Sequence, residues 1–318
     1  MENTVRGNVI RFCGIAGIAG LSARNYLVEN NLLEWIGWQD AEHMSESAGV
    51  KFHNATNLLF RNNVIRHMRH APGIWLDIGN INCRLTRNGF ADIYSVHAAI
   101  WIEGTHREDL IDNNIVSGVR EAERLTPPGV ETGGGSGIYI LGTDNLIVTQ
   151  NLFSHIATAG IHVRVEEERI VQGRGGTARN NRVYNNIFHD CGTAAIEFGN
   201  EQNEADGNLY ASMPGGFLSI LYPGRRERLD LETWREFYGW GEHGQMADMN
   251  AELDADTLEL SLAMEGQPSP VKVYHRVDMD FFGNETGDMR LPGPFSELPG
   301  ERVNVDPREK KSLSENRR

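Results

Sequence analysis

Short runs of alternating apolar and polar residues recur along the first two thirds of the chain. Each run opens on a small residue, and apolar side chains then occupy every second position, as in Ile74 and Leu76 or Ile100 and Ile102. Because successive side chains of a β-strand point to opposite faces, this alternation predicts short strands with one apolar face. The small residues that open the runs are Gly49, Gly73, Ala99, Gly137, Gly160 and Ala195.

A second repeat lies between these runs and consists of an Asn followed by mostly apolar residues. Its copies begin at Asn8, Asn31, Asn63, Asn88, Asn114, Asn151, Asn186 and Asn208. Successive copies are separated by as few as 22 residues, from Asn186 to Asn208, and as many as 37, from Asn114 to Asn151. A short unit with occasional insertions is typical of a solenoid. The helical stretches of about 10 to 15 residues that βαβ units place between strands do not occur.

The two repeats together predict an all-β fold, a right-handed parallel β-helix. Each coil is expected to add short strands to long parallel sheets, with the apolar side chains stacked inside. Asn is favoured in tight turns and bonds to neighbouring backbone, so we expect the repeated Asn to form a ladder of side-chain amides at one turn.

The repeat fades after Asn208, so we expect residues 1–210 to form the β-helix that carries the site. Residues 211–318 are expected to be a capping and wrapping segment over the open end, with a short helix from Leu229 to Trp240, Asp230 as its N-cap and a mobile charged tail. Since the first repeat begins close to Met1, we expect a partner, a second copy of the chain or preceding coils to cover the other end.

Composition narrows the functional classes. Hydrophobic residues make up 40% and charged residues 23% of the chain, which is typical of a folded soluble protein. The net charge of −14 offers no basic surface for nucleic acid, and no apolar stretch reaches the roughly 20 residues needed to cross a membrane. No signal peptide is visible, which predicts a cytoplasmic location if the N-terminus is complete. Three cysteines are too few for a disulfide framework or a CxxC zinc site.

Alignment of the coils places the outward residues in two columns. The first column contains Lys51, Trp75, Trp101, Tyr139, His162 and Glu197, and the second contains His53, Asp77, Glu103, Leu141, Arg164 and Gly199. Asp77 and Glu103 fall at equivalent places in consecutive coils, so their carboxyl groups are expected roughly 5 to 6 Å apart. Retaining glycosidases hold their two carboxyl groups about 5 to 5.5 Å apart. Such a pair divides into one protonated acid and one ionised nucleophile.

The residues around this pair favour a sugar as the ligand. Trp75 and Trp101 are expected to form an exposed aromatic wall for sugar rings, and Lys51 and His53 to donate hydrogen bonds. The remaining candidate binding residues of the columns are Tyr139, His162 and Arg164.

Three insertions, at 37–48, 117–136 and 165–182, are expected to wall a pocket, with the GRGG segment at 173–176 as a flexible turn. Asp40, Glu42 and His43 lack a repeated ligand spacing, and no metal site is predicted.

Five segments resemble the β-helix core of glycoside hydrolase family 120, the retaining β-xylosidases. They are ESAGVKFH (46–53), GIWLD (73–77), RLTRN (84–88), IWIEGTH (100–106) and DLIDNNI (109–115). The resemblance implies that Asp77 is the nucleophile and Glu103 the acid/base. It also implies that Glu46, Lys51 and His53 line the sugar site, and His106 matches a His that follows the acid/base strand. Members of that family are about twice as long and contain N-terminal coils and an inserted β-sandwich that this chain lacks.

The first hypothesis is therefore a retaining, exo-acting glycosidase on β-xylosides or a related sugar, which acts on plant-type oligosaccharides without a cofactor. A second is a polysaccharide lyase with Ca²⁺ and Lys51 or Arg164 as the base, although the negative charge of the chain opposes binding of polyanions. A third is a carbohydrate-binding β-helix without catalytic activity.

Overall fold

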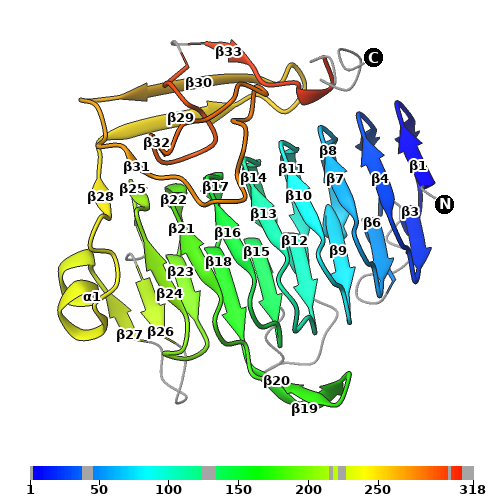
Figure 1. Cartoon of the computed structure of the whole chain (residues 1–318). Coiled ribbons are helices and arrows are strands. Elements are labelled where there is room, and N and C mark those ends of the chain that lie inside the picture. Colours follow the sequence, from blue (N-terminus) through cyan, green and yellow to red (C-terminus); the bar gives the residue numbers. More distant parts are fainter. Residues whose placement is uncertain are drawn as a thin grey trace.

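The computed structural model describes residues 3–37, 46–123, 134–214, 218–220, 227–299 and 302–309. Three parallel sheets form the walls of a solenoid (Figure 1). Sheet A contains β1 (Asn3–Arg6), β4 (Tyr26–Glu29), β7 (Leu59–Arg61), β10 (Arg84–Thr86), β13 (Leu110–Asp112), β16 (Ile147–Thr149), β21 (Arg182–Tyr184) and β24 (Glu204–Asp206). Sheet B contains β2 (Val9–Arg11), β5 (Leu32–Glu34), β8 (Val64–His70), β11 (Gly89–Ser95), β14 (Ile115–Glu121), β17 (Leu152–Ile156), β22 (Ile187–Cys191), β25 (Leu209–Ala211) and β28 (Gln245–Met246).

Sheet C carries the candidate site. It contains β3 (Ala16–Leu21), β6 (Ala48–His53), β9 (Ile74–Asp77), β12 (Ala98–Glu103), β15 (Ser136–Leu141), β18 (Ala159–Arg164), β23 (Ala194–Phe198), β26 (Leu218–Ile220) and β27 (Glu227–Leu229). Its strands are parallel except for β27, which pairs antiparallel with β26. The prediction of an all-β right-handed parallel β-helix is thus confirmed.

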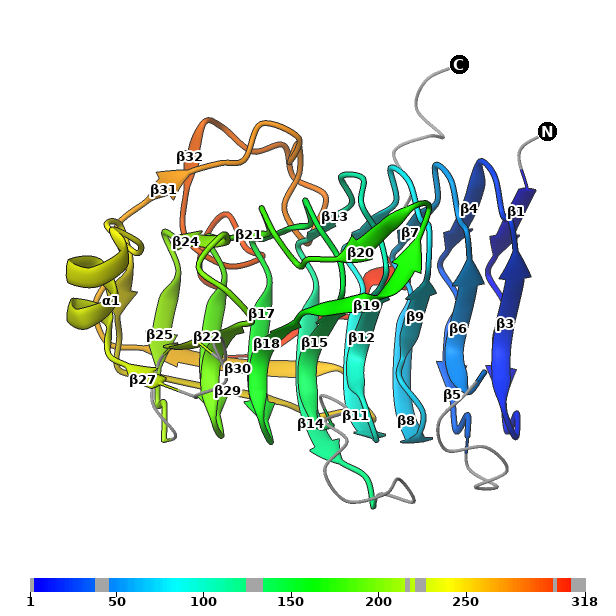
Figure 2. The same cartoon turned by 90° about the horizontal axis from the view of Figure 1, so that it is seen from below.

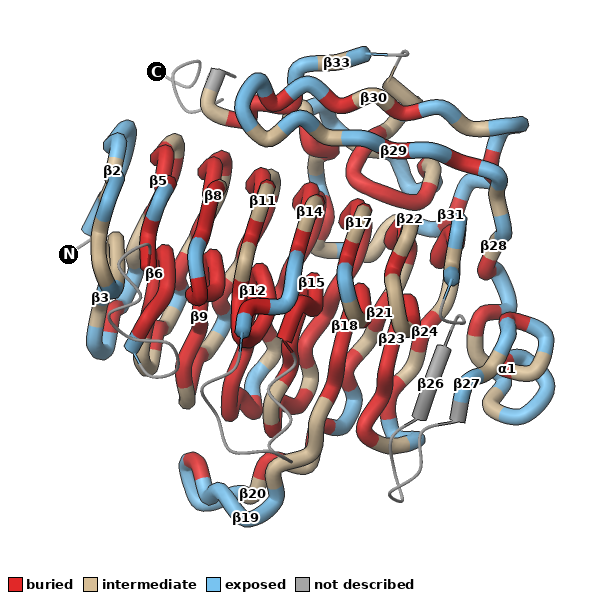
Figure 3. The backbone as a smooth tube through the Cα atoms, turned by 180° about the vertical axis from the view of Figure 1, so that it is seen from behind, coloured by how far each residue is buried: buried red, intermediate tan, exposed pale blue. Residues whose placement is uncertain are grey.

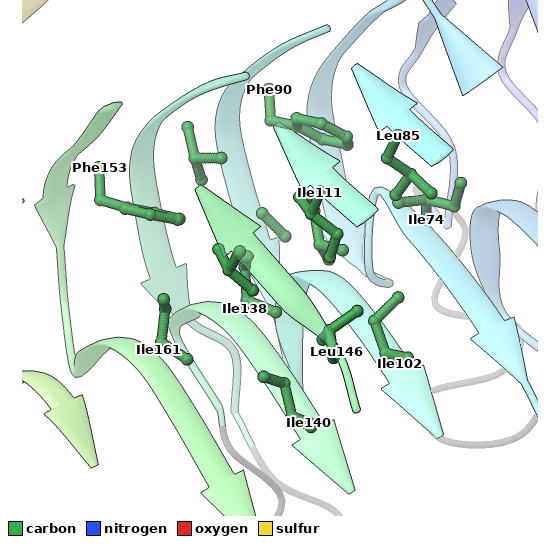
Figure 4. Packing of buried hydrophobic residues seen from close by; sticks show 14 of the residues in the cluster. Ile74, Leu85, Phe90, Ile102, Ile111, Ile138, Ile140, Leu146, Phe153 and Ile161 are labelled. Carbon is green, nitrogen blue, oxygen red and sulfur yellow. The ribbon is translucent and has the colours of Figure 1, made fainter. Parts of the chain in front are cut away.

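The interior of the solenoid is apolar, as the alternation predicts. On sheet C, Ile74 pairs with Ile100, which pairs with Ile138, which pairs with Ile161, and all four side chains are fully buried. Figure 4 shows how such residues from successive coils stack along the axis. Full burial of each such side chain contributes about 1.5 to 3 kcal/mol relative to its exposure. Figure 3 shows that the buried backbone runs through the middle coils, whereas the first coil is largely exposed.

The repeated Asn forms the predicted ladder. Each Asn side-chain amide donates to the Oδ1 of the Asn in the next coil, from Asn8 through to Asn208. The same Oδ1 accepts the backbone N–H of the preceding Asn, as in the 3.0 Å bond from Asn88 N to Asn114 Oδ1. Both groups are buried in the central coils, where water cannot replace the bonds.

We expect Asn114→Ala to lower the free energy of unfolding by roughly 3 kcal/mol or more. The change removes the acceptor of the Asn88 backbone N–H and the donor to Leu85 O, and both groups are buried. Urea unfolding followed by circular dichroism measures the effect. Asn8→Ala, at the exposed end of the same ladder, is the control and is expected to cost less than about 1 kcal/mol. Equal effects at the two positions would contradict a structural role of the buried ladder.

The predicted helix is present as α1 (Leu231–Tyr238), and Asp230 is its N-cap, since its side chain accepts the N–H of Thr233. Trp234 on this helix is fully buried and stacks on Phe198 of β23, with ring centroids 5.8 Å apart. The helix therefore lies at the end of the solenoid, next to β27 (Figure 1). It is too short and too polar to span a membrane, and no other helix in the described ranges has a membrane-spanning character.

The segment after α1 does not stay at the end of the solenoid. It runs back along the outside of sheet B. It forms β29 (Met249–Leu253), β30 (Glu259–Met264), β31 (Val271–Lys272), β32 (Met289–Arg290), β33 (Val303–Asn304) and the 3-10 helix at Pro307–Glu309. Met249, Leu260 and Phe281 from this segment pack on an outward apolar row of sheet B. That row consists of Leu32, Val64, Ile115, Leu152, Ile187 and Leu209, the residues that follow the repeated Asn. The charged tail beyond residue 309 lies outside the described residues.

Candidate functional site

The first outward column lies in continuous register on sheet C. Lys51 pairs with Trp75, Trp75 with Trp101, Trp101 with Tyr139, Tyr139 with His162, and His162 with Glu197. In the second column His53 pairs with Asp77, and Leu141 pairs with both Glu103 and Arg164. Asp77 and Glu103 each follow the paired residues Leu76 and Ile102, so they occupy equivalent places on adjacent strands. Adjacent strands lie about 4.8 Å apart.

Asp77 is buried and surrounded by hydrogen-bond donors. Its Oδ2 lies 3.2 Å from Lys51 Nζ and 2.8 Å from His53 Nδ1, and its Oδ1 accepts the backbone N–H of Ile78 at 2.9 Å. Lys51 Nζ also lies 3.0 Å from a carboxylate oxygen of Glu46, whose side chain is mostly exposed. Both oxygens of the Asp77 carboxylate are therefore held by neighbouring nitrogen atoms.

Glu103 is buried, and both of its carboxylate oxygens are engaged. Oε2 accepts the indole N–H of Trp75 at 3.0 Å, and Oε1 forms an ion pair with Arg169. Lys51 Nζ lies 3.4 Å from the centre of the Trp75 ring. Lys51 contacts Asp77, Trp75 contacts Glu103, and Lys51 and Trp75 contact each other. These two residues therefore connect the two carboxylates, which the sequence related only through the register of the strands.

The expectation of an exposed aromatic wall is wrong. Trp75 and Trp101 are only 5% and 6% exposed, because they stack on each other with ring centroids 3.8 Å apart and an interplanar angle of 11°. His97 covers Trp101 at 3.9 Å, and Tyr139 belongs to the same cluster. The indoles form a small second core on the outside of the solenoid, and this packing offsets the cost of placing them there.

The third insertion is a hairpin that lies against the candidate site. Strands β19 (Glu166–Val171) and β20 (Arg174–Gly176) pair antiparallel, and Figures 1 and 2 show them passing the ends of β15 and β12 toward β9. The GRGG segment is thus part of an ordered hairpin and not the flexible turn that was expected. The other two insertions fall largely on 38–45 and 124–133, outside the described residues, as do Asp40, Glu42 and His43.

Three stacked glycine turns allow the hairpin to approach so closely. Gly79, Gly104 and Gly142 follow the second column in successive coils and all have positive φ. At Gly104 a Cβ atom would lie 3.1 Å from Val171 and 3.0 Å from Ile78, so a larger residue would push the hairpin away. Arg169 reaches Glu103 from this hairpin.

The remaining candidate binding residues lie beside or beyond the pair. His106 Nδ1 lies 2.9 Å from Asp144, and His162 Nδ1 lies 3.0 Å from Glu197. These contacts fix the two imidazole rings and leave the Nε2 atom of each buried without a hydrogen-bond partner in the described structure. The indole nitrogen of Trp101 is likewise buried without a hydrogen-bond partner in the described structure. Arg164 lies farther along the column, 4.0 Å from Glu166 on the hairpin.

Arg169, Asp144 and His97 were not predicted from the sequence. Arg169 lies in an insertion and has no place in the repeat, so no column could reveal it. Asp144 follows the glycine turn of the next coil, in the same relation to Gly142 as His106 to Gly104, and alignment of the turns would have found it. His97 precedes its strand and carries no periodic signal. Among the residues that the structure describes, no cluster of three or more His, Cys, Asp or Glu could hold a metal ion.

Comparisons with known proteins agree with this architecture. A family model described as "Right handed beta helix region" matches residues 1–123 and 97–222. The chain is also similar to a solved structure described as "The complex structure of XylC with xylose", with a TM-score of 0.63 and 16% identity over 94% of this chain. The aligned part covers 51% of that protein, so this chain spans about half its length. At this identity the similarity shows the fold alone. No curated protein matches the sequence.

Proposed function

The chain belongs to the family of right-handed β-helix proteins, and we propose that it acts on this scaffold as a retaining glycoside hydrolase, exo-acting and β-xylosidase-like, on oligosaccharides. The observation that carries the proposal is the pair of buried carboxylates, Asp77 and Glu103, at equivalent places on adjacent strands of one sheet. The xylose held by the structurally similar XylC supports a sugar as the ligand.

Asp77 is the nucleophile in this proposal. Lys51, His53 and the N–H of Ile78 all contact its carboxylate and hold it in one orientation for attack. It attacks the anomeric carbon and forms a glycosyl-enzyme ester, while the leaving-group oxygen takes a proton from the second carboxyl group.

Glu103 is the acid and then the base. The indole of Trp75 fixes one oxygen, and the other becomes available when Arg169 withdraws. The freed oxygen then carries the proton that is donated to the leaving group. After the first step the same group, now ionised, removes a proton from water, which hydrolyses the ester with net retention of anomeric configuration.

Three buried nitrogens could hold the sugar hydroxyls. Trp101 Nε1 is a donor, and the Nε2 atoms of His106 and His162 donate or accept according to the tautomer. Buried polar groups without partners are rare in folded proteins and are costly unless a ligand or water satisfies them. Trp101 and His162 lie on sheet C and His106 lies in the turn that follows β12, and these three groups favour a hydroxyl-rich ligand.

The lyase alternative loses support from the same contacts. Lys51 is paired with two carboxylates, Asp77 and Glu46, whereas the base of a β-elimination must be free to accept a proton. Arg164 lies away from the pair, beside Glu166.

Arg169 must leave Glu103 before the proton can be transferred, and this gives a prediction. In Arg169→Gln the carboxyl group of Glu103 keeps its proton more easily, so the alkaline limb of the kcat/KM profile should move to higher pH, by about half a unit or more. The profile with an aryl glycoside measures this. Arg174→Gln, an exposed arginine on the other strand of the hairpin, is the matched control and should leave the profile unchanged. If the kcat/KM profile of Arg169→Gln is not shifted, the ion pair between Arg169 and Glu103 has no part in the mechanism.

A panel of aryl glycosides, with the first-formed product followed by NMR, tests the proposed function. We expect turnover of a β-linked pentoside or related sugar, with the β-anomer formed first. First formation of the α-anomer would contradict the double displacement. Absence of turnover across the panel, with binding of the same sugars, would favour a carbohydrate-binding protein.

A further inference from the structure

A cavity of about 580 Å³ lies away from the candidate active site. Its walls come from β21 and β24 of sheet A, from residues 239–243 after α1 and from residues 270–275 at β31. Figures 1 and 2 show α1 and β31 beside β24, at the C-terminal end of the solenoid, whereas β9 and β12 lie in the middle coils of a different sheet. Its volume falls within the roughly 300 to 1,000 Å³ that is typical of small-molecule sites.

Aromatic rings line this cavity and pack against other rings. Trp240 stacks on Tyr238, with ring centroids 4.7 Å apart and an interplanar angle of 14°, and also packs against Trp234 at 4.8 Å. Tyr274 also lines the cavity, and its ring centroid lies 4.4 Å from that of His275. Trp240 and Tyr274 are only partly buried, so part of each ring faces the cavity. Rigid aromatic rings provide a large contact area at a low entropic cost.

Hydrogen-bonding groups surround the rings and are nearly balanced in charge. Glu204 pairs with Arg182 at 2.9 Å and also accepts the hydroxyl of Tyr184. Asp206 accepts both the backbone N–H and the ring Nδ1 of His243, each at 2.7 Å.

The remaining charges do not change this balance. Asp206 raises the pKa of His243, so this pair is neutral as a whole when the imidazole is protonated. Glu242 and Lys272 are the other two charged residues of the wall and have opposite signs. Together with the adjacent Arg182, two fixed cations and His243 face the three carboxylates of this wall, so the cavity has little net charge to attract an anion or a cation.

From these contacts we infer that the cavity is a second, non-catalytic binding site for a neutral sugar, which stacks on Trp240 and bonds through its hydroxyls to the polar wall. The C–H face of a pyranose suits the aromatic ring, and its hydroxyls both donate and accept, as this wall of carboxylates, Tyr184 and Lys272 requires. The site lies at the edge of another sheet and does not depend on the proposed activity.

The indole N–H signals of the six tryptophans test this site apart from the active site. Trp240→Phe assigns the Trp240 signal, and the protein is titrated with xylobiose, cellobiose and mannobiose under ¹⁵N–¹H NMR. We expect the Trp240 signal to shift and saturate with at least one of them, whether or not the signals of Trp75 and Trp101 respond. Tyr274→Ala should weaken this binding at least tenfold, while Phe237→Ala, an exposed residue of α1 outside the cavity, should not.

Three results would overturn the inference. One is a Trp240 signal that none of the three disaccharides moves. Another is binding that is as tight in Tyr274→Ala as in the wild type, when melting curves show both to be folded. The third is tighter binding of glucuronate or glucosamine than of glucose, because a charged ligand would contradict the charge balance of the wall. Shifts at Trp75 or Trp101 alone would report the candidate active site and would also count against a second site.

Discussion

Asp77→Asn is expected to lower kcat for aryl glycosides by about three to five orders of magnitude, as removal of a covalent nucleophile does in other enzymes. The amide has nearly the same shape as the carboxylate, and its oxygen can still accept the N–H of Ile78. It cannot attack an anomeric carbon. Steady-state kinetics with a β-xyloside or the best substrate of the panel measures the loss.

The contacts of Asp77 make a folding control necessary. The substitution leaves Lys51, which is 5% exposed, with only the exposed carboxylate of Glu46 as a counter-charge. Thermal unfolding must therefore show that the variant is folded at the assay temperature. Asp92→Asn alters a partly buried carboxylate on sheet B that pairs with His67, and it should leave kcat within about twofold. Loss of activity in Asp92→Asn as large as in Asp77→Asn, or near wild-type turnover by folded Asp77→Asn, would contradict the assigned nucleophile.

Glu103→Ala is expected to give the second large effect, with a different signature. Substrates with poor leaving groups should lose about three orders of magnitude in kcat/KM because they need the proton, whereas an activated aryl glycoside should lose much less. The glycosyl-enzyme then accumulates because no base activates water. Azide, which needs no base, should enter the space left by the side chain and raise turnover at least tenfold, with a β-glycosyl azide as the product.

The product formed with azide also shows which carboxylate is the acid/base and which is the nucleophile. Rescue of the alanine variant at Glu103 with retained configuration assigns the acid/base. An α-glycosyl azide from that variant would mean that the anion had replaced the nucleophile, and the roles of Asp77 and Glu103 would have to be exchanged. Glu197→Gln serves as the matched control, because Glu197 is an equally buried carboxylate of the first column that lies several coils away. It should show no rescue.

Much of the fold follows from the sequence because a solenoid repeats local rules. The alternation around Ile74, Ile100 and Ile138 fixes which face is inside, and the repeated Asn fixes the turn. Both patterns depend only on neighbours in the same or the next coil. The outward columns follow from the same alignment, and the observed pairs of Trp75 with Trp101 and of Trp101 with Tyr139 confirm the register.

The parts that escaped prediction depend on long-range contacts. Trp75 and Trp101 looked exposed because an outward position was equated with contact with solvent, but their mutual stacking and His97 bury them. Arg169 reaches Glu103 from an insertion whose path no repeat specifies. The row beginning with Leu32 and Val64 reads as outward and apolar, and only the structure shows that the C-terminal segment covers it.

Trapping of the glycosyl-enzyme tests the central claim most directly. The protein is incubated with an activated 2-deoxy-2-fluoro glycoside of the sugar it hydrolyses, digested, and sequenced by mass spectrometry. If Asp77 is the nucleophile and its acid partner lies one coil away, one added sugar is expected on the peptide from β9, on Asp77 itself. A label on Glu103 or on any residue outside sheet C, or rapid turnover with no covalent adduct, would contradict it.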